Sequence, residues 1–372
     1  MNRWTKGVAV AFALTMPFGS LPVTASAAPS DIVINEANFP NPTIRNLVSD
    51  HDLNRDGILD DDENEKITGI YELYSNIDNL KGIEYLKNLR ELSIHSDSLF
   101  SVNLSGNPLL EGIWIGAPLN SIDLSNQSNL KVLELHDNNI KNLDVSHNID
   151  LEYLWLWNTK FSSINLSKNV KLRELHMSDN SLSNIIFPDK SPISLIYLDN
   201  NNIENLDLTK FPMLVDLDLR NNHIKKLVFS NNTDLKSVSI SKNELNTADF
   251  SSNKKLTYLD IGDNPLISVN NLPFGVCVSV PDSTGCIDNW YIYGSTYNGS
   301  YQNGAFDLSA IDSNFDSEKV SSLDGATLQG SHLILPRDQE EVDVTYFYDA
   351  GSTSALEARL HLTNATYTPV VP

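Results

Sequence analysis

The chain has 372 residues, of which 26 are Lys or Arg and 48 are Asp or Glu, so its formal charge at pH 7 is −22. A field of this sign repels nucleic-acid phosphates and anionic lipid, which argues against both as partners. Hydrophobic residues make up 41% of the chain, an ordinary share for a folded protein, and this argues against global disorder. The length is enough for two or three domains.

Residues 1–27 predict a secretory signal peptide. Arg3 and Lys6 form a basic start, an apolar stretch follows, and small residues end the segment at Ala27. The alternative, a membrane anchor, is disfavoured because the apolar stretch is too short to span about 30 Å of hydrocarbon and is interrupted by Pro17. We therefore expect a monomer that is secreted, extracellular or held at the cell surface, with no insertion into the membrane.

Residues 28–66 predict a helical cap that carries a calcium loop. Asn41 followed by Pro42 is typical of a helix start. The segment from Asp52 to Glu63 matches the spacing D-x-[DN]-x-[DN]-G-x₅-E, in which Ca²⁺ takes oxygens from positions 1, 3, 5, 7, 9 and 12. The predicted ligands are Asp52, Asn54, Asp56, the Ile58 carbonyl, Asp60 and Glu63, and Gly57 permits the sharp turn. The alternative is an acidic turn that binds no ion.

Residues 67–272 repeat with a period of 21. The first aliphatic residue of each unit stands at Leu130, Leu151, Leu172, Ile193, Leu214, Leu235 and Leu256, and weaker copies extend back to Ile67 for about ten units in all. Apolar residues return at offsets 3, 5, 10, 13 and 15, with Asn usual at offset 8. Alternation over so few residues is typical of short strands, so we expect a mainly β solenoid with two short parallel strands in each coil. The Asn side chains are expected to satisfy backbone groups in the turns.

This pattern resembles the leucine-rich repeat, whose LxxLxLxxNxL core stands here from Leu130 to Ile140. The 21-residue form, with the acidic loop before it, is similar to secreted bacterial proteins related to the internalins. The resemblance implies a binding protein whose partners meet the concave, strand-lined face. The pattern departs from the family at Asp97 and Thr159, which take the place of Asn, and in a shortened coil around Pro118.

Two further segments follow the repeats. Residues 273–298 predict an exit segment that contains the only two cysteines, Cys277 and Cys286, and in an oxidising compartment a disulfide between them is favoured over two free thiols. Residues 299–372 alternate in the manner of strands and turns, which predicts a small β-sandwich with an immunoglobulin-like fold. We expect it to act as a spacer or end cap.

The residues between the buried aliphatics should point outward from the strands, and on one side they are varied and aromatic. The predicted ligand-binding residues are Trp114, His136, Tyr153, Trp155, Trp157, His176, Tyr197, Asp199, Asp218 and Tyr258. Exposed tryptophan and tyrosine are enriched where partners bind tightly. The alternative is that the rings only stack on one another and stiffen the sheet. The partner could be an extracellular protein, including a host protein, or a glycan; a purely structural role at the cell surface is a third reading.

No catalytic constellation is evident. His95, His136 and His176 share the outward surface, but we expect them two coils, or about 10 Å, apart, which is too far for one Zn²⁺. Glu134 and Glu174 are separated in the same way, with no cleft implied. No GxSxG, HExxH or phosphate-binding glycine loop occurs. The sequence therefore favours a binding protein over an enzyme, with calcium as its only cofactor.

Overall fold

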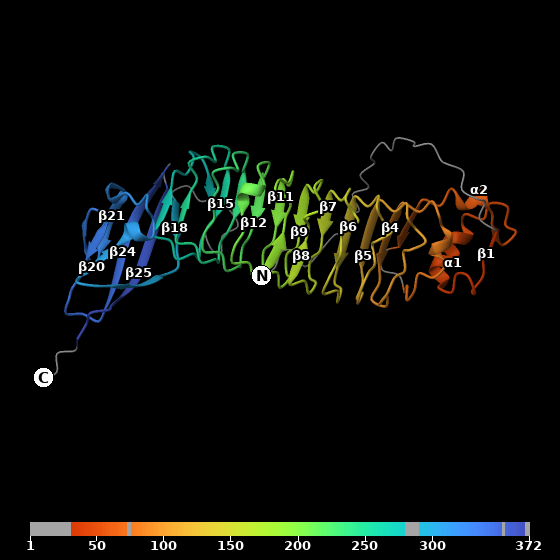
Figure 1. Ribbon diagram of the computed structural model, residues 1–372, viewed down its shortest axis with the longest axis horizontal. Coiled ribbons are helices and arrows are strands. Elements are labelled where there is room, and N and C mark those ends of the chain that lie inside the picture. Colours follow the sequence, from red (N-terminus) through yellow and green to blue (C-terminus); the bar gives the residue numbers. More distant parts are fainter. Residues whose placement is uncertain (1–30, 73–75, 280–289, 352–353, 369–372) are drawn as a thin grey trace.

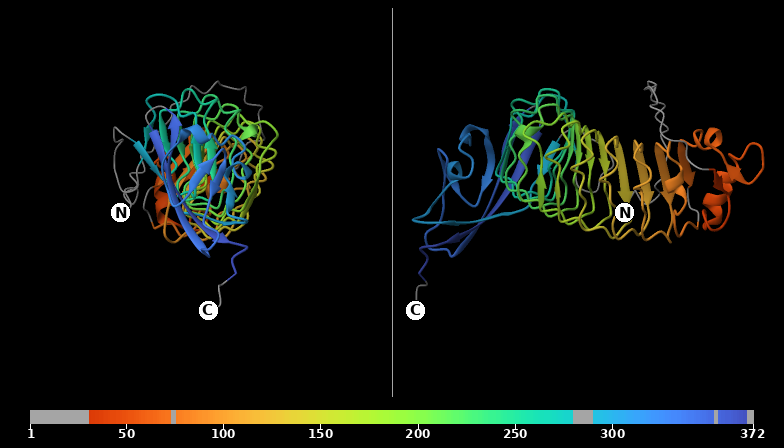
Figure 2. Two further views of the ribbon diagram at one scale, coloured as in Figure 1. Left: turned by 90° about the vertical axis from the view of Figure 1, so that its left-hand side faces the viewer. Right: turned by 45° about the vertical axis from the view of Figure 1, so that its right-hand side comes forward.

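The computed structural model describes residues 31–72, 76–279, 290–351 and 354–368. The chain forms an elongated solenoid with a helical cap at one end and a pair of small sheets at the other (Figures 1 and 2). The predicted signal peptide lies outside the described residues. Mainly β structure and about ten stacked coils confirm the predicted fold class.

The cap is built around two short helices. Helix α1 (Pro42–Ser49) begins after Asn41, whose side chain accepts the N–H groups of Thr43 and Ile44, and helix α2 (Asp61–Asn64) begins with a capping box between Asp60 and Glu63. Strands β1 (Ile32–Val33) and β2 (Ile58–Leu59) pair in antiparallel fashion beside them. The cap shares the core of the solenoid, because its apolar side chains belong to the same buried cluster as the leucines of the coils.

An eleven-stranded parallel sheet runs the length of the solenoid. Inward-facing residues such as Leu133, Leu154 and Leu175 occupy equivalent places on neighbouring strands and have no exposed surface. The 21-residue period therefore places one strand of each coil directly beside the next. The strands are β3 (Gly69–Glu72), β4 (Glu91–His95), β5 (Gly112–Gly116), β6 (Val132–His136), β7 (Tyr153–Trp155), β9 (Glu174–His176), β11 (Leu195–Tyr197), β12 (Asp216–Asp218), β13 (Ser237–Ser239), β15 (Tyr258–Asp260) and β17 (Cys277–Val278).

The asparagines at offset 8 form a ladder between coils, as predicted. Asn222 is typical: its Oδ1 accepts the N–H of Ile203 at 2.9 Å, and its Nδ2 donates to the carbonyl of Leu198 at 3.0 Å, both in the preceding coil. Asn201, Asn243 and Asn264 make the corresponding bonds. Each amide thus satisfies backbone groups at the end of a strand, where the ladder of the sheet no longer reaches.

The expectation of a second strand in every coil is wrong for most coils. On the side opposite the main sheet, the described part of the solenoid forms two strand pairs, β8 (Ser163–Asn165) with β10 (Asn184–Ile186) and β14 (Thr247–Asp249) with β16 (Ser268–Asn270). β-Branched residues, which favour extended backbone, centre three of these four strands, namely Ile164, Ile185 and Val269. Val102 and Ile122 hold the equivalent place in coils that form no second strand, so this residue alone does not decide the pairing.

The C-terminal part contains two sheets. One has strands β18 (Trp290–Tyr293), β25 (Ser354–Asn364), β24 (Glu341–Gly351) and β21 (Val320–Asp324), with β19 (Tyr297–Tyr301) also on β25; the other has β20 (Ala305–Asp307), β23 (His332–Ile334) and β22 (Thr327–Gln329). Strand β18 belongs to this unit although it lies in the segment expected to be an exit. The immunoglobulin-like assignment stays a prediction. Short 3₁₀ turns complete the chain: η1 (Ile83–Tyr85), η2 (Leu208–Lys210), η3 (Leu308–Ala310) and η4 (Ser317–Lys319).

The C-terminal unit packs directly on the last coils of the solenoid. The Leu272 N–H donates to the Ala350 carbonyl at 3.0 Å, and the Tyr346 hydroxyl donates to the Ile267 carbonyl at 2.9 Å. Both units contribute to one continuous hydrophobic core. Cys277 is disulfide-bonded, while Cys286 lies outside the described residues, so the predicted pairing stays a prediction.

Candidate functional site

The outward side of the eleven-stranded sheet, which we call the strand face, carries all ten residues predicted to bind a ligand. The register aligns its side chains in rows that cross the strands. One row runs Trp114, Glu134, Trp155, His176, Tyr197, Asp218, Ser239 and Asp260. A neighbouring row contains His95, Gly116 and His136 and continues into the coils of Trp157, Asp199 and Arg220. Residues up to 165 positions apart in the sequence therefore form one surface.

The N-terminal half of the strand face is a chain of aromatic rings. Trp155 lies 6.3 Å from Tyr153 and 5.6 Å from His176, and His176 lies 4.6 Å from Tyr197, all measured between ring centroids. In the neighbouring row the His136 ring is stacked on Trp157 at 5.0 Å, with planes only 3° apart. These contacts bear out the stacking that was considered as the alternative to binding. Stacking does not exclude binding, because it also holds the rings in fixed places.

His95 and His136 stand two strands apart, as expected, with β5 between them. Their rings nevertheless lean toward each other, and the ring centroids lie only 5.3 Å apart. The residue between them is Gly116, and a Cβ built there would lie 2.5 Å from His95 Nδ1 and 2.6 Å from His136 Nε2. The two rings therefore occupy the space that a side chain at position 116 would fill. The sequence analysis did not include His95 among the ligand-binding residues. The glycine at position 116 was the signal that could have found it, because it leaves room for the two histidine rings to meet.

The aromatic side chains are half-buried rather than fully exposed. Trp114, Trp155 and Trp157 each pack along the sheet, and the side chain of Trp290 lies outside the described set. The Trp155 Nε1 atom is buried without a hydrogen-bond partner, and the buried His176 Nε2 atom lies 3.6 Å from a Glu174 carboxylate oxygen. Buried polar atoms without a partner are uncommon in folded proteins, and a bound water or ion is one explanation for them.

The C-terminal half of the strand face is acidic. Asp199, Asp216, Asp218 and Asp260 point outward from β11, β12 and β15 or their ends, and Arg220 is the one basic residue among them. Arg220 is committed to Asp218, with its Nε within 3.0 Å of both carboxylate oxygens. Asp260 accepts the Ser241 hydroxyl at 2.8 Å, and Asp216 accepts the Tyr197 hydroxyl at 2.9 Å. The two halves of the face thus differ in chemistry, and they meet at Tyr197.

Burial perturbs the charged groups of the face. It raises the pKa of Asp218, against the lowering effect of Arg220, and it raises the pKa of Asp260. Burial likewise raises the pKa of Glu134, opposed only by His136. The pKa of His95 is lowered, first by burial and then by the neighbouring His136. In each case a charged form is partly withdrawn from water, which costs free energy unless an opposite charge is near.

The predicted calcium loop is a tight, hydrogen-bonded turn. Asp52 accepts the N–H groups of Arg55 and Gly57, and Glu63 Oε1 accepts the N–H of Leu53 at 2.7 Å, which closes the loop. Gly57 has a φ of 80°, as the motif requires. The oxygen donors fit Ca²⁺ in kind and order, but their carboxylates are directed to backbone N–H groups. Among the described residues no group of three or more His, Cys, Asp or Glu side chains is gathered so as to hold a metal ion.

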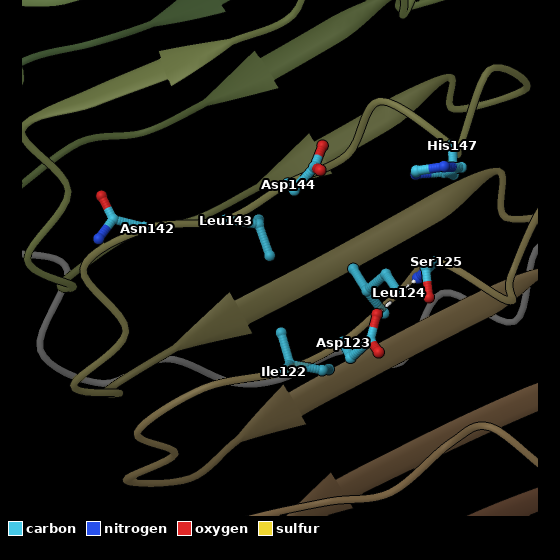
Figure 3. A pocket seen from close by; sticks show the side chains of 8 residues that line it. All are labelled: Ile122, Asp123, Leu124, Ser125, Asn142, Leu143, Asp144 and His147. Carbon is cyan, nitrogen blue, oxygen red and sulfur yellow. Dashed lines mark hydrogen bonds between the residues drawn. The ribbon is translucent and has the colours of Figure 1, made fainter.

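A shallow hollow of about 390 Å³ lies on the side opposite the strand face (Figure 3). Its floor is formed by Ile122 and Leu143, and its rim includes Asp123, Asp144 and His147. The carboxylates on the rim accept the N–H groups of Ser125 and Ser146, two residues on, and so shape the turns. These hydrogen bonds give the two aspartates a structural role, so no ligand is needed to explain them.

A comparison with known structures found several similar proteins. One is the functional domain of InlJ from Listeria monocytogenes, described as including a cysteine ladder, which is 17% identical in sequence. The match covers 91% of this chain and 99% of that chain, with a TM-score of 0.53. The internalin InlF from the same organism is 21% identical, covers 66% of this chain and 85% of its own, and has a TM-score of 0.50. This chain has the leucine-rich-repeat solenoid fold. With two cysteines in its sequence, it has no residues for such a cysteine ladder.

A leucine-rich-repeat protein from Leptospira interrogans, LIC12759, is also similar, with 23% identity and a TM-score of 0.51. The match covers 58% of this chain and 63% of that one. Neither protein-family models nor curated proteins gave a match. Within the described ranges no helix is long and apolar enough to cross a membrane. These likenesses establish the solenoid; the role of the strand face rests on its own chemistry.

Proposed function

We propose that this chain is a secreted or surface-associated bacterial binding protein that captures an extracellular protein, in the manner of an adhesin, through its strand face. The observation that carries the proposal is the continuous group of half-buried rings centred on Trp155 and His176, in which the Trp155 Nε1 atom has no hydrogen-bond partner. Rigid aromatic side chains give large contact area at little entropic cost, and such residues dominate tight interfaces. The chain acts as a scaffold for recognition and performs no catalysis.

The test is a binding screen with purified extracellular protein domains and a glycan array, run side by side. The full chain is expected to retain at least one protein, and the variants Trp155→Ala and Trp157→Ala to lose it by tenfold or more. Phe100→Ala is the matched control, because Phe100 is 55% exposed and lies outside the strands of the main sheet. Binding that is equal in all variants would refute the role of the face. Retention of glycans alone would replace the protein partner with a carbohydrate.

The same experiment separates binding from stiffening. If the rings serve only to stabilise the sheet, Trp155→Ala should lower the melting temperature strongly and leave no binding to lose. We expect a moderate loss of stability, because the rings pack on the outside of a core that is complete without them. Circular dichroism of each variant shows whether the fold is intact.

We also propose that the loop from Asp52 to Glu63 binds calcium and stabilises the cap. Support comes from the order of its oxygen donors, from Gly57 and from the closure of the loop by Glu63. Calorimetric titration should detect one site, and calcium should raise the melting temperature of the wild-type chain but not of Asp56→Ala, which loses the oxygen ligand at position 5. Asp249→Ala, which carries the same change in the solenoid, is the control. Absence of heat at millimolar calcium would end this proposal.

A further inference from the structure

The strand face carries an unbalanced charge. Among the described residues of the main sheet, the outward positions hold Glu91, Glu134, Glu174, Asp199, Asp216, Asp218 and Asp260 but a single arginine, Arg220. Asp218 pairs with Arg220, and Glu134 and Glu174 lie near His136 and His176. Among the described residues Asp260 makes no ion pair and has Arg220 only as a more distant cation. A partner that meets this face must either bring cations or pay the cost of burying several carboxylates together.

The imbalance is centred on strand β13. Its two outward residues, Ser237 and Ser239, are small, as is Ser241 beyond its end, and Ser239 stands in register between Asp218 on one side and Asp260 on the other. The two aspartates are therefore about 9.6 Å apart along the sheet, or two strand spacings. A long basic side chain lying over Ser239 would reach both carboxylates. Serine hydroxyls already orient one of them, since Ser241 donates to Asp260.

The surroundings favour a cation at this place. Tyr258 on strand β15 is the register partner of Ser237 on strand β13, so an aromatic ring lies beside the serines. Burial raises the pKa of Asp260 and of Asp218, so their charged forms lack full hydration in the free protein. The pKa of Arg220 is raised first by its hydrogen bonds to Asp218 and also by the charges of Asp199 and Asp260. One guanidinium is thus the nearby cation for three carboxylates. A second cation, supplied by a partner, would balance the negative charge that Arg220 alone does not balance.

We propose that the protein partner captured by the strand face presents a lysine or arginine side chain that lies over the serines of β13 between Asp218 and Asp260, while an apolar side chain of the same partner packs on Trp155. This inference rests on the proposed function and adds the chemistry of the partner. Trp155 and Ser239 are four strands apart, about 19 Å, which an extended peptide spans with about six residues. An acidic or neutral partner surface would bring no further cation to these carboxylates.

The probe is an array of synthetic peptides, each with one tryptophan or leucine and, two to eight residues further on, one Lys, Arg, Gln or Glu. The full chain should prefer Lys and Arg over Gln by about fivefold at low salt, most strongly near a separation of six residues, and Glu should abolish binding. The preference should disappear at high salt. Equal binding of the Lys and Gln peptides would overturn the inference.

Two variants locate the effect. Asp260→Asn keeps an acceptor for Ser241 but removes the charge, and Ser239→Lys supplies a built-in cation; both should erase the preference for basic peptides. The matched controls are Asp234→Asn, a change of the same charge in an exposed pair with Lys255, and Ser239→Ala, which adds no charge. A preference that survives in both Asp260→Asn and Ser239→Lys would also overturn the inference.

Ser239→Lys gives a readout that needs no ligand. The inserted ammonium group should relieve the buried carboxylates, so the variant should melt at a higher temperature than Ser239→Ala at pH 8 and lose this advantage at pH 3, where the carboxyls are protonated. Failure of the proposed function is distinguishable from failure of this inference. If the wild type and Trp155→Ala bind every peptide equally, the proposed function fails; if binding depends on Trp155 but ignores charge, only this inference fails.

Discussion

Replacement of Asn222 by alanine should destabilise the chain by about 2–4 kcal/mol. The Asn222 side chain is 5% exposed, and its Oδ1 is the acceptor for the N–H of Ile203, a residue that is itself 2% exposed. Loss of this acceptor leaves a buried donor unsatisfied, which costs about 1–3 kcal/mol, and the missing amide leaves a small cavity. The carbonyls that Asn222 binds are less affected, because Leu198 and Leu219 also accept from Asn201 and Asn243.

Because a solenoid is stabilised coil by coil, the effect should be local as well as global. Hydrogen exchange measured residue by residue should show reduced protection at Ile203 and its neighbours, with less change near the cap. Urea unfolding gives the overall loss. Unchanged protection at Ile203, together with a loss below about 0.5 kcal/mol, would refute the view that the ladder satisfies the backbone.

Three further substitutions test other features. Thr159→Asn should stabilise the chain by about 1 kcal/mol in urea unfolding, since Thr159 interrupts the ladder and Asn138 Nδ2 beside it is buried without a partner. Lys242→Asn should raise stability by about 0.5–1 kcal/mol, because Lys242 has a φ of 56° in a column otherwise filled by Asn and Asp. Asp312→Ala should loosen the C-terminal unit, seen as faster proteolysis there, because Asp312 is 5% exposed and accepts from Ser268, Thr247 and Asn270.

The repeat could be predicted almost completely from the sequence. Each buried leucine, each ladder asparagine and the outward position of each tryptophan follow from a constant step of 21 residues, because the period fixes which side chains become neighbours. Departures from the period were equally informative. Thr159 and the short coil at Pro118 flank Asn138, whose Oδ1 turns to the N–H of Ile140 in its own coil instead of the coil before.

Features that depend on contacts between coils were harder to predict. The close approach of His95 and His136 depends on the absence of a side chain at Gly116, and an estimate based on strand spacing alone could not include it. The lack of a second strand in most coils has no signal at one position, because Val102 and Ile122 are β-branched like Ile164 yet lie in coils without that strand. Strand β18 joins the C-terminal sheet by pairing with β25, more than 60 residues later, and no local pattern encodes that partner.

Glu134 provides a test of whether the strand face is arranged for stability. Burial raises the pKa of Glu134, so its protonated form is favoured in the folded chain; its contribution to stability is therefore present below the ordinary pKa of about 4.5 and is lost as the pH rises through the raised value. Glu134→Gln should accordingly raise the melting temperature at pH 7–8 and give no gain at pH 4. Glu152→Gln, at a residue that pairs with Arg173 beside the face, is the control and should give no such gain.

A gain of this kind would mean that the native carboxylate costs stability where it stands. A scaffold arranged only to be stable would carry small polar residues at these positions, as strand β13 does with Ser237 and Ser239. Buried carboxylates beside unsatisfied aromatic side chains are instead typical of surfaces whose interactions are completed by a partner. A uniform loss of stability in Glu134→Gln at every pH would show that the carboxylate serves the fold, and the case for a binding face would then rest on the tryptophans alone.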